Sequence, residues 1–323
     1  MTSEMSKQLP ETDLIDLSDD KDADSQRSSP VILTKHPNKH NTGKGRKGEE
    51  KVQEKGSKGG HESPSHSIGD SLSLNSNDSN DPRRLVPWVN CQEKIILCLD
   101  LSNEMNEKSF PSKKAPDFTA YQFVRKAAKI FVNNKAMLNS IHEFGVITLA
   151  DDATWYQQFE SNPDMICTLL DHLNPSEEDN QDTFDMEKLF QTICQRIALP
   201  EVEDPALPPP YVIRVIMIYG RSHCPPHFTD RSRQMLRELL QSPYFFFDVL
   251  YVHELPSENN QCEAIYDSFC ELDEDEDGYM LEVSRSTSRL FDHMAILLAH
   301  PLQRPKQRDT FYELQNRDDN ETT

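Results

Sequence analysis

Short apolar runs alternate with amphipathic stretches over most of the sequence. Almost unbroken apolar runs at 94–99, 211–219 and 245–252 are typical of strands that are buried on both faces of a sheet. Between the first two runs, apolar residues recur at spacings of three, four and seven from Phe123 to Val132, which predicts a helix with one buried face. The two periodicities together predict a protein in which strands and helices alternate along the chain.

The remaining segments extend this alternation. The pattern predicts further strands at 144–149, 154–159 and 279–283, and helices that start at Asn162, follow Thr183, and span 230–240, 262–270 and 287–299. The gap before 154–159 has the length of a hairpin, so this strand is predicted to run antiparallel to its neighbour. We therefore expect a doubly wound α/β domain with a mostly parallel sheet and helices on both faces.

The first 87 residues differ in composition from the rest. They contain no Phe, Trp or Tyr and consist largely of Ser, Asp, Lys, Asn, Gly and Glu. Such a segment buries too little apolar surface to offset the entropy lost on ordering, so residues 1–87 are predicted to form a disordered tail. The folded domain is predicted to span 88–299, and residues 300–323 to form an extended C-terminal segment. A chain that begins near Leu85 is expected to keep the full-length melting temperature.

The distribution of charge disfavours nucleic acid as a partner. The chain has a net charge of -21, of which residues 88–323 contribute -19. A folded part this acidic repels phosphate backbones, so we expect no direct binding to nucleic acid. A basic run at 35–58 could still touch nucleic acid or serve as a weak nuclear signal, but a solvated tail is the favoured interpretation.

Cysteine usage and hydropathy indicate an intracellular protein. Seven cysteines without paired spacing are typical of reduced thiols in the cytosol or nucleus. The N-terminus has no apolar signal core, and the longest apolar runs are too short to cross a bilayer. We expect a soluble protein of the cytoplasm and nucleus that does not bind membranes.

The residues after the first strand are a candidate metal site, because open α/β sheets bind ligands beyond the carboxyl ends of their strands. Asp100-Leu-Ser102-Asn-Glu104 resembles the Asp-x-Ser-x-Ser opening of the metal-ion-dependent adhesion site in von Willebrand A domains, with Glu104 in place of the second Ser. Thr183 matches the next ligand of that family, but the turn at 219–221 lacks its final Asp and contains an arginine. We expect a degenerate site (Asp100, Ser102, Thr183) that holds no Mg²⁺, and no other cofactor.

Two other stretches contain residue types that bind metals. The acidic run at 273–277 with Gly278 matches the first half of an EF-hand loop, but position twelve is Ser284 where a Glu is required. The segment 223–227 offers two histidines and a cysteine, but a structural zinc site needs four ligands and no second pair is evident. The favoured interpretations are an acidic loop, which could bind a partner or an ion, and a proline-stiffened surface loop.

No sequence motif supports catalysis. The chain has no nucleophile elbow, no phosphate-binding loop and no dinucleotide fingerprint, so we expect no enzymatic activity. Two alternatives stay open. One is a metal-dependent A-domain that binds an acidic protein ligand, which a Mg²⁺ titration would test. The other is a hydrolase that uses His223 and Cys224, which activity of the isolated chain would support.

The segment after the last predicted helix is a candidate for partner binding. Its sequence is His300-Pro301-Leu302-Gln-Arg304-Pro305, and its two prolines favour an extended backbone that loses little entropy on docking. Leu302 offers an apolar anchor, and Arg304 offers five donors in a rigid fork. An ordinary C-terminal stop is equally compatible with these residues.

Four blocks, at 89–102, 208–212, 242–249 and 298–305, resemble a known family. This family is the von Willebrand A-like scaffold subunit of the BRISC and BRCA-one-A deubiquitinase complexes. The resemblance implies a non-catalytic scaffold that binds a BRE-type subunit with ubiquitin-conjugating-enzyme-variant domains. Through that subunit it would join Abraxas-type subunits and a JAMM-type deubiquitinase specific for polyubiquitin linked through lysine sixty-three. It also implies roles in the DNA damage response and in mitosis and signalling, and insertion of 300–305 into the BRE-type partner.

Overall fold

The computed structural model describes residues 89–108, 110, 118–178, 181–204, 206–272 and 277–310. The predicted tail, most of the acidic run at 273–277 and residues 311–323 lie outside the described residues. Within the described part of the chain, no helix is both long enough and apolar enough to span a membrane.

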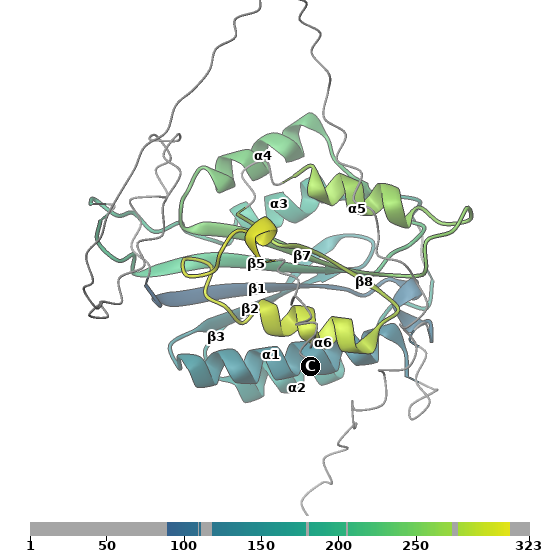
Figure 1. Ribbon diagram of the computed structural model, residues 1–323, viewed down its shortest axis with the longest axis horizontal. Coiled ribbons are helices and arrows are strands. Elements are labelled where there is room, and N and C mark those ends of the chain that lie inside the picture. The colour runs from purple at the N-terminus through teal and green to yellow at the C-terminus, as the bar shows by residue number, and fades with distance from the viewer. Residues whose placement is uncertain are drawn as a thin grey trace, which may run out of the picture. The chain divides into compact units, whose positions relative to one another are not determined.

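A six-stranded sheet forms the centre of the domain (Figure 1), with the strand order β3-β2-β1-β5-β7-β8. The strands are β1 (Gln92–Asp100), β2 (Glu143–Leu149), β3 (Ala153–Glu160), β5 (Tyr211–Tyr219), β7 (Phe245–His253) and β8 (Met280–Ser284). Neighbouring strands are parallel except for β2 and β3, which pair antiparallel. The predicted doubly wound α/β architecture with one antiparallel strand is therefore confirmed.

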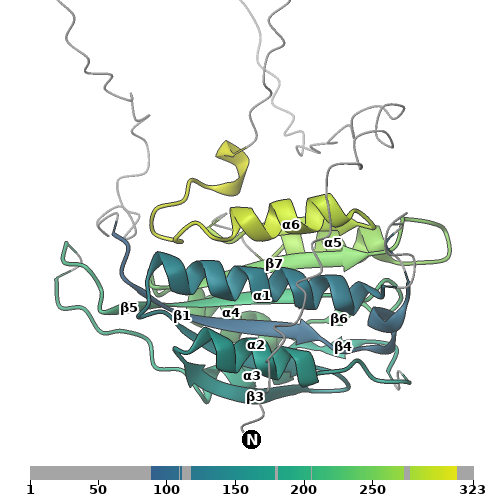
Figure 2. The ribbon, with the colours of Figure 1, turned by 90° about the horizontal axis from the view of Figure 1, so that it is seen from below.

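Helices cover both faces of this sheet, as Figures 1 and 2 show. One face carries α1 (Ala120–Leu138), α2 (Pro163–His172) and α6 (Thr287–Ile296), and the other carries α3 (Met186–Cys194), α4 (Asp230–Leu240) and α5 (Cys262–Cys270). Successive side chains of β1 point to opposite faces of the sheet. Ile95 and Leu97 pack in the core under α1, whereas Ile96 and Cys98 pack in the core on the other face. Because both faces are covered, the central strands are apolar at nearly every position.

Capping residues fix where helices begin. At α1, the Thr119 hydroxyl accepts a hydrogen bond from the Gln122 backbone N–H, and the Gln122 side chain accepts one from the Thr119 N–H, which completes a capping box. At α2, the Asn162 side chain caps the helix and Pro163 occupies its first turn. The helix start predicted at Asn162 is thus confirmed.

Two differences from the sequence-based prediction concern strands and α-helices. Two-residue strands, β4 (Phe184–Asp185) and β6 (Pro226–His227), form a small parallel sheet that was not predicted, since two residues carry no detectable periodicity. Helix α6 ends at Ile296 instead of residue 299. The carbonyls that would continue it, including those of Leu297 and Ala299, accept hydrogen bonds from buried cationic side chains.

Candidate functional site

The carboxyl end of the sheet contains the candidate metal site. Asp100 ends β1 and is 1% exposed, and its carboxylate accepts hydrogen bonds from the backbone N–H of Ser102 (2.9 Å) and Gly220 (2.8 Å). The Arg221 Nε lies 3.2 Å from both carboxylate oxygens. A guanidinium therefore supplies the positive charge beside Asp100, at the position where the sequence motif suggested a metal.

The surrounding residues hold the Arg221 side chain in place. Its Nη2 donates to the carbonyls of Leu149 (3.2 Å) and Ala150 (2.7 Å), and its guanidinium centre lies 4.7 Å from the centre of the Phe184 ring. Gly220 packs closely beside it, because a Cβ at this position would collide with the Met105 sulfur and force that side chain to move. The loops around the Asp100–Arg221 pair thus hold both side chains in a fixed position.

The other two predicted ligand residues lie in different environments. Ser102 is buried, and its Oγ has no hydrogen-bond partner among the described residues, whereas Thr183 is exposed just before β4. Glu104, which replaces the second Ser of the motif, accepts hydrogen bonds from the backbone N–H of Ser222 (2.6 Å) and His223 (3.2 Å). Glu104 thus ties the loop after β1 to the loop after β5, and the absence of Mg²⁺ binding stays a prediction.

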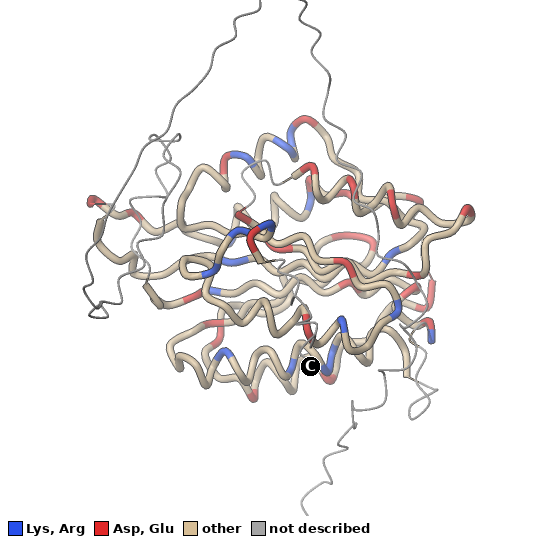
Figure 3. Tube along the Cα trace, viewed as in Figure 1, with Lys and Arg blue, Asp and Glu red and all other residues tan. Residues whose placement is uncertain are grey.

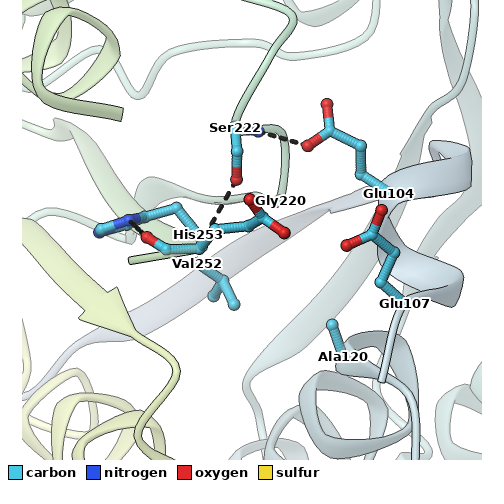
Figure 4. Close-up of a pocket in the computed structure, with 8 residues that line it drawn as sticks. Glu104, Glu107, Ala120, Gly220, Ser222, Val252 and His253 are labelled. Atoms are coloured by element: carbon cyan, nitrogen blue, oxygen red, sulfur yellow. Dashed lines mark hydrogen bonds between the residues drawn. The ribbon is translucent and has the colours of Figure 1, made fainter. Parts of the chain in front are cut away.

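A small acidic cavity lies next to this pair (Figure 4). Glu104 and Glu107 face it from one side, across from Gly220 and Ser222, and Glu254 completes the lining carboxylates. Burial, followed by a hydrogen bond with Glu254 and the charges of Glu254 and Glu104, raises the pKa of Glu107. The cavity measures about 10 Å³, which is room for no more than a water-sized group.

The segment 223–227 is a surface loop only in part. His223 and His227 are exposed, as predicted for a loop, but Cys224 is buried, with its Sγ 3.6 Å from Arg221 Nη1. Among the described residues, no group of three or more His, Cys, Asp or Glu side chains is arranged to hold a metal ion.

Toward the amino ends of the strands lies a buried ionic network, which we define as Glu93, Lys135, Arg214, Asp248 and Arg304. Arg214 is at its centre: its Nε is 2.7 Å from Asp248 Oδ2, and its Nη1 is 3.3 Å from Glu93 Oε2. Lys135 donates to the other Glu93 oxygen. All five residues are at most 9% exposed, so each charge depends on its partners in place of water.

This network binds the chain that follows α6. The Arg214 Nη1 donates to the carbonyls of Leu297 (2.7 Å) and Ala299 (3.1 Å), and Lys135 Nζ donates to that of Leu298 (3.2 Å). Burial alone would raise the pKa of Asp248, but the Arg304 and Arg214 guanidiniums outweigh it and hold that pKa below its usual range. Asp248 therefore stays ionised and joins the sheet to the C-terminal chain.

Arg304 is the outermost member of the network. Its Nη1 and Nη2 lie 3.0 and 2.6 Å from the two oxygens of Asp248, so the pair is bidentate. Its guanidinium also covers the Tyr279 ring at 4.0 Å, and the Tyr279 hydroxyl donates to the Pro305 carbonyl at 2.7 Å. The arginine that we predicted to reach toward a partner is thus engaged inside the domain.

The structure brings the predicted partner-binding residues together on one turn. The backbone N–H groups of Gln303 and Arg304 both donate to the His300 carbonyl, so the segment folds back at this point. The extended backbone predicted for 300–305 from its two prolines is therefore wrong, because these hydrogen bonds close a turn. His300, Pro301 and Arg304 are buried, Leu302 is half-buried against a small apolar cluster, and Gln303 and Pro305 are exposed. Burial, partly opposed by Glu93, lowers the pKa of His300 to about 4.

Sequence reasoning did not identify the residues that hold this turn. Arg214 and Asp248 each interrupt an otherwise apolar strand, and a charge in such a run must be paired inside the protein. That signal could have marked both residues, although it could not have named their partners.

Comparison with known proteins gives clear relatives by sequence. No family model matches the chain. The zebrafish protein named BRISC and BRCA1-A complex member 1 is 38% identical over 71% of this chain and 62% of its own length, so the chain spans less than two thirds of it. The bovine protein of that name is 38% identical over 73% of this chain and 72% of its length, and the human protein is 37% identical over 72% and 71%.

Comparison with solved structures gives matches of low sequence identity and low TM-score. The SpRpn10 VWA domain covers 67% of this chain and 99% of its own, with 12% identity and a TM-score of 0.45. The PilB minor pilin from Streptococcus sanguinis covers 67% and 63%, with 10% identity and a TM-score of 0.45. Family membership follows from the sequence relatives: with 37% and 38% identity over more than two thirds of the human and bovine proteins, the chain belongs to the BRISC and BRCA1-A complex member 1 family.

Proposed function

We propose that this chain is a non-catalytic scaffold subunit of a BRISC- or BRCA1-A-type deubiquitinase complex. The names of its relatives, which are members of those complexes, support this role. The Asp100–Arg221 pair supports it as well, because the carboxylate of the candidate metal site already faces an internal cation. In this proposal the cleavage of polyubiquitin linked through lysine sixty-three belongs to a JAMM-type subunit of the complex.

The direct partner in this proposal is a BRE-type subunit with ubiquitin-conjugating-enzyme-variant domains. Through it, the chain would be linked to Abraxas-type subunits and to the JAMM-type enzyme. The nuclear form of the complex would act in the DNA damage response, and the cytoplasmic form in mitosis and signalling.

The observation that carries the proposal is the turn at 300–305, which the buried ionic network holds in one conformation. Arg304 and Arg214 fix it from inside, so that Gln303 and Pro305 are exposed and Leu302 remains half-exposed. A docking segment that is already ordered loses little entropy when a partner binds. The rigid turn therefore supports direct recognition of this segment.

A binding assay between the full-length chain and a purified BRE-type partner tests the proposal. The double variant Leu302→Ala, Pro305→Ala removes surface contacts and leaves Arg304 in place. Losing a central interface anchor typically costs about 2 kcal/mol, so the dissociation constant should rise roughly thirty-fold. Deleting residues 300–323 would be a poorer test, because it also removes Arg304 from the buried ionic network.

The control is Gln158→Ala, an exposed position on β3, which should leave affinity unchanged. Both variants should keep the melting temperature of the parent chain within a few degrees. Undiminished binding by a folded double variant would show that another surface carries assembly.

A further inference from the structure

A groove runs between the outer sides of α1 and α2, on the face of the sheet that also carries α6. It has a volume of about 390 Å³, and its apolar lining comes from Phe118 and Ile130, which are 37% and 43% exposed. Three cationic side chains of α1, those of Arg125, Lys126 and Lys129, also line it. The groove therefore offers both apolar surface and positive charge to a ligand.

The positive charge of this groove is only partly balanced. Asp171 of α2 is its one carboxylate; Lys129 Nζ lies 2.6 Å from Asp171 Oδ2, and Arg125 Nε lies 3.9 Å from Oδ1. Lys126 has no ionic or hydrogen-bond partner among the described residues. Figure 3 shows the basic positions along α1 in a domain whose overall charge is strongly negative. The ligand that fits is a segment with both carboxylates and aliphatic side chains.

The N-terminal part of this chain contains such a segment at 11–20, with the sequence Glu-Thr-Asp-Leu-Ile-Asp-Leu-Ser-Asp-Asp. Five acidic residues alternate there with Leu14, Ile15 and Leu17, and no Lys or Arg interrupts them. The acidic run at 273–277 fits less well, because it is tethered between α5 and β8 and α5 covers the opposite face of the sheet. In the C-terminal residues 311–323, the apolar and acidic residues are separated and include Arg317.

We propose that the acidic segment 11–20 docks into the groove between α1 and α2 of the same chain. About 70 residues separate it from Val89, and a chain can span up to roughly 3.4 Å per residue, so the tether is long enough to reach the groove. Tethering through such a linker gives an effective concentration on the order of 1 mM. At that concentration, a weak affinity of about 100 µM keeps roughly nine tenths of the chains docked. Partner segments of the same acidic and aliphatic chemistry would have to displace the tail.

Site-specific crosslinking in the full-length chain tests this docking. A benzoylphenylalanine at position 15, in place of Ile15, is photoactivated at low protein concentration, and the crosslinked peptides are identified by mass spectrometry. Crosslinks should fall on the peptides that contain Phe118 and Ile130, and their yield should decrease when the salt concentration is raised from about 50 to 500 mM. Crosslinks to other surfaces, or none within the chain, would overturn the proposal.

Two charge-reversal variants, one in the groove and one on the opposite face of the sheet, serve as test and control. Lys126→Glu reverses a groove cation that has no ionic partner in the described part of the chain. It should lower the crosslink yield at least about three-fold, because it replaces an attraction by a repulsion. Arg237→Glu, an exposed position on α4, should leave the yield unchanged. Equal yields for the two variants, each with an unaltered melting temperature, would contradict docking in the groove.

A mixture of isotopically labelled and unlabelled chains separates docking within a chain from docking between two copies. In each crosslinked pair, both peptides should be labelled or both should be unlabelled, as expected when they come from the same chain. Crosslinks of mixed isotopic origin that dominate the spectrum would show a second copy in the groove and would also overturn the proposal.

Discussion

The two ends of the parallel sheet each contain a buried aspartate paired with an arginine, but the pairs have different surroundings. At the carboxyl end, Asp100 faces Arg221 and accepts two backbone hydrogen bonds. Toward the amino end, Asp248 faces two guanidiniums, from Arg214 and Arg304, and belongs to a network of five charged side chains. The first pair joins neighbouring loops, whereas the second joins the central strands to the chain after the last helix.

This difference shows how one fold can use a buried cation in two ways. Arg221 supplies positive charge beside Asp100 at the carboxyl end and connects neighbouring loops through the carbonyls of Leu149 and Ala150. The network toward the amino end instead fixes the position of the turn at 300–305. If this comparison is right, removing an arginine should cost more in the network than in the isolated pair.

The largest effect is expected for Arg214→Met. The substitution leaves Glu93 and Asp248 buried with fewer partners and frees the carbonyls of Leu297 and Ala299. Breaking a buried ion pair by removing one partner typically costs about 3–5 kcal/mol. Urea denaturation at pH 7, monitored by circular dichroism, should show a loss of that size in the free energy of unfolding.

The control for this measurement is Arg237→Met, an exposed arginine on α4, which should change the free energy of unfolding by less than about 0.5 kcal/mol. A loss below about 1 kcal/mol for Arg214→Met would mean that the network contributes little to stability.

A smaller loss is expected at the carboxyl end for Arg221→Leu. Asp100 keeps the hydrogen bonds from the Ser102 and Gly220 N–H groups, and charge-assisted bonds of this kind contribute substantially to stabilising a buried carboxylate. The same denaturation experiment should give a loss of about 2–3 kcal/mol, near the lower limit for a broken buried pair. A loss as large as that of Arg214→Met would remove the contrast between the two ends.

The pH dependence of stability should also come from the amino end. The imidazole of His300 binds a proton near pH 6.5 in the unfolded chain, whereas burial lowers its pKa in the folded chain to about 4. Stability from His300 is therefore complete above pH 6.5 and decreases as the pH falls from 6.5 toward 4. One proton gives a slope of at most about 1.4 kcal/mol per pH unit.

The variant His300→Gln measures this contribution. Denaturation midpoints recorded between pH 7 and pH 5 should depend less on pH in the variant than in the parent chain. Burial lowers the pKa values of His142 and His293 as well, so a residual slope of the same sign should remain. Glu93 and Asp248, whose pKa values are lowered in spite of burial because of nearby cations, should matter only at lower pH. Identical slopes for the two chains would contradict the assignment to His300.

The sequence predicted the sheet and the six main helices because each strand and helix has its own apolar period. It predicted the two ends of the sheet less completely, because their chemistry depends on residues that are distant in sequence. The Tyr219-Gly220-Arg221 turn already showed that a cation replaces a carboxylate, but only the structure places Arg221 against Asp100. From the sequence, the Arg304 guanidinium is interpreted as a contact for a partner, but in the structure it binds Asp248. No local sequence pattern shows that Asp248 lies close to the chain after the last helix.

The smallest expected effect concerns Mg²⁺ at the carboxyl end. Mg²⁺ needs near-octahedral oxygen ligands at about 2.1 Å, and a dication that close to Asp100 would face the Arg221 guanidinium, whose Nε is 3.2 Å from both carboxylate oxygens. Titration calorimetry of the full-length chain with Mg²⁺ should therefore show no saturable heat. At 10 mM Mg²⁺, binding weaker than 10 mM stabilises the fold by less than about 0.4 kcal/mol, so the melting temperature should rise by less than about 2 °C. The matched variant Asp100→Ala should respond in the same way as the parent chain. A saturable heat that disappears in Asp100→Ala would show that the metal displaces Arg221, and the carboxyl end would then be a working cation site after all.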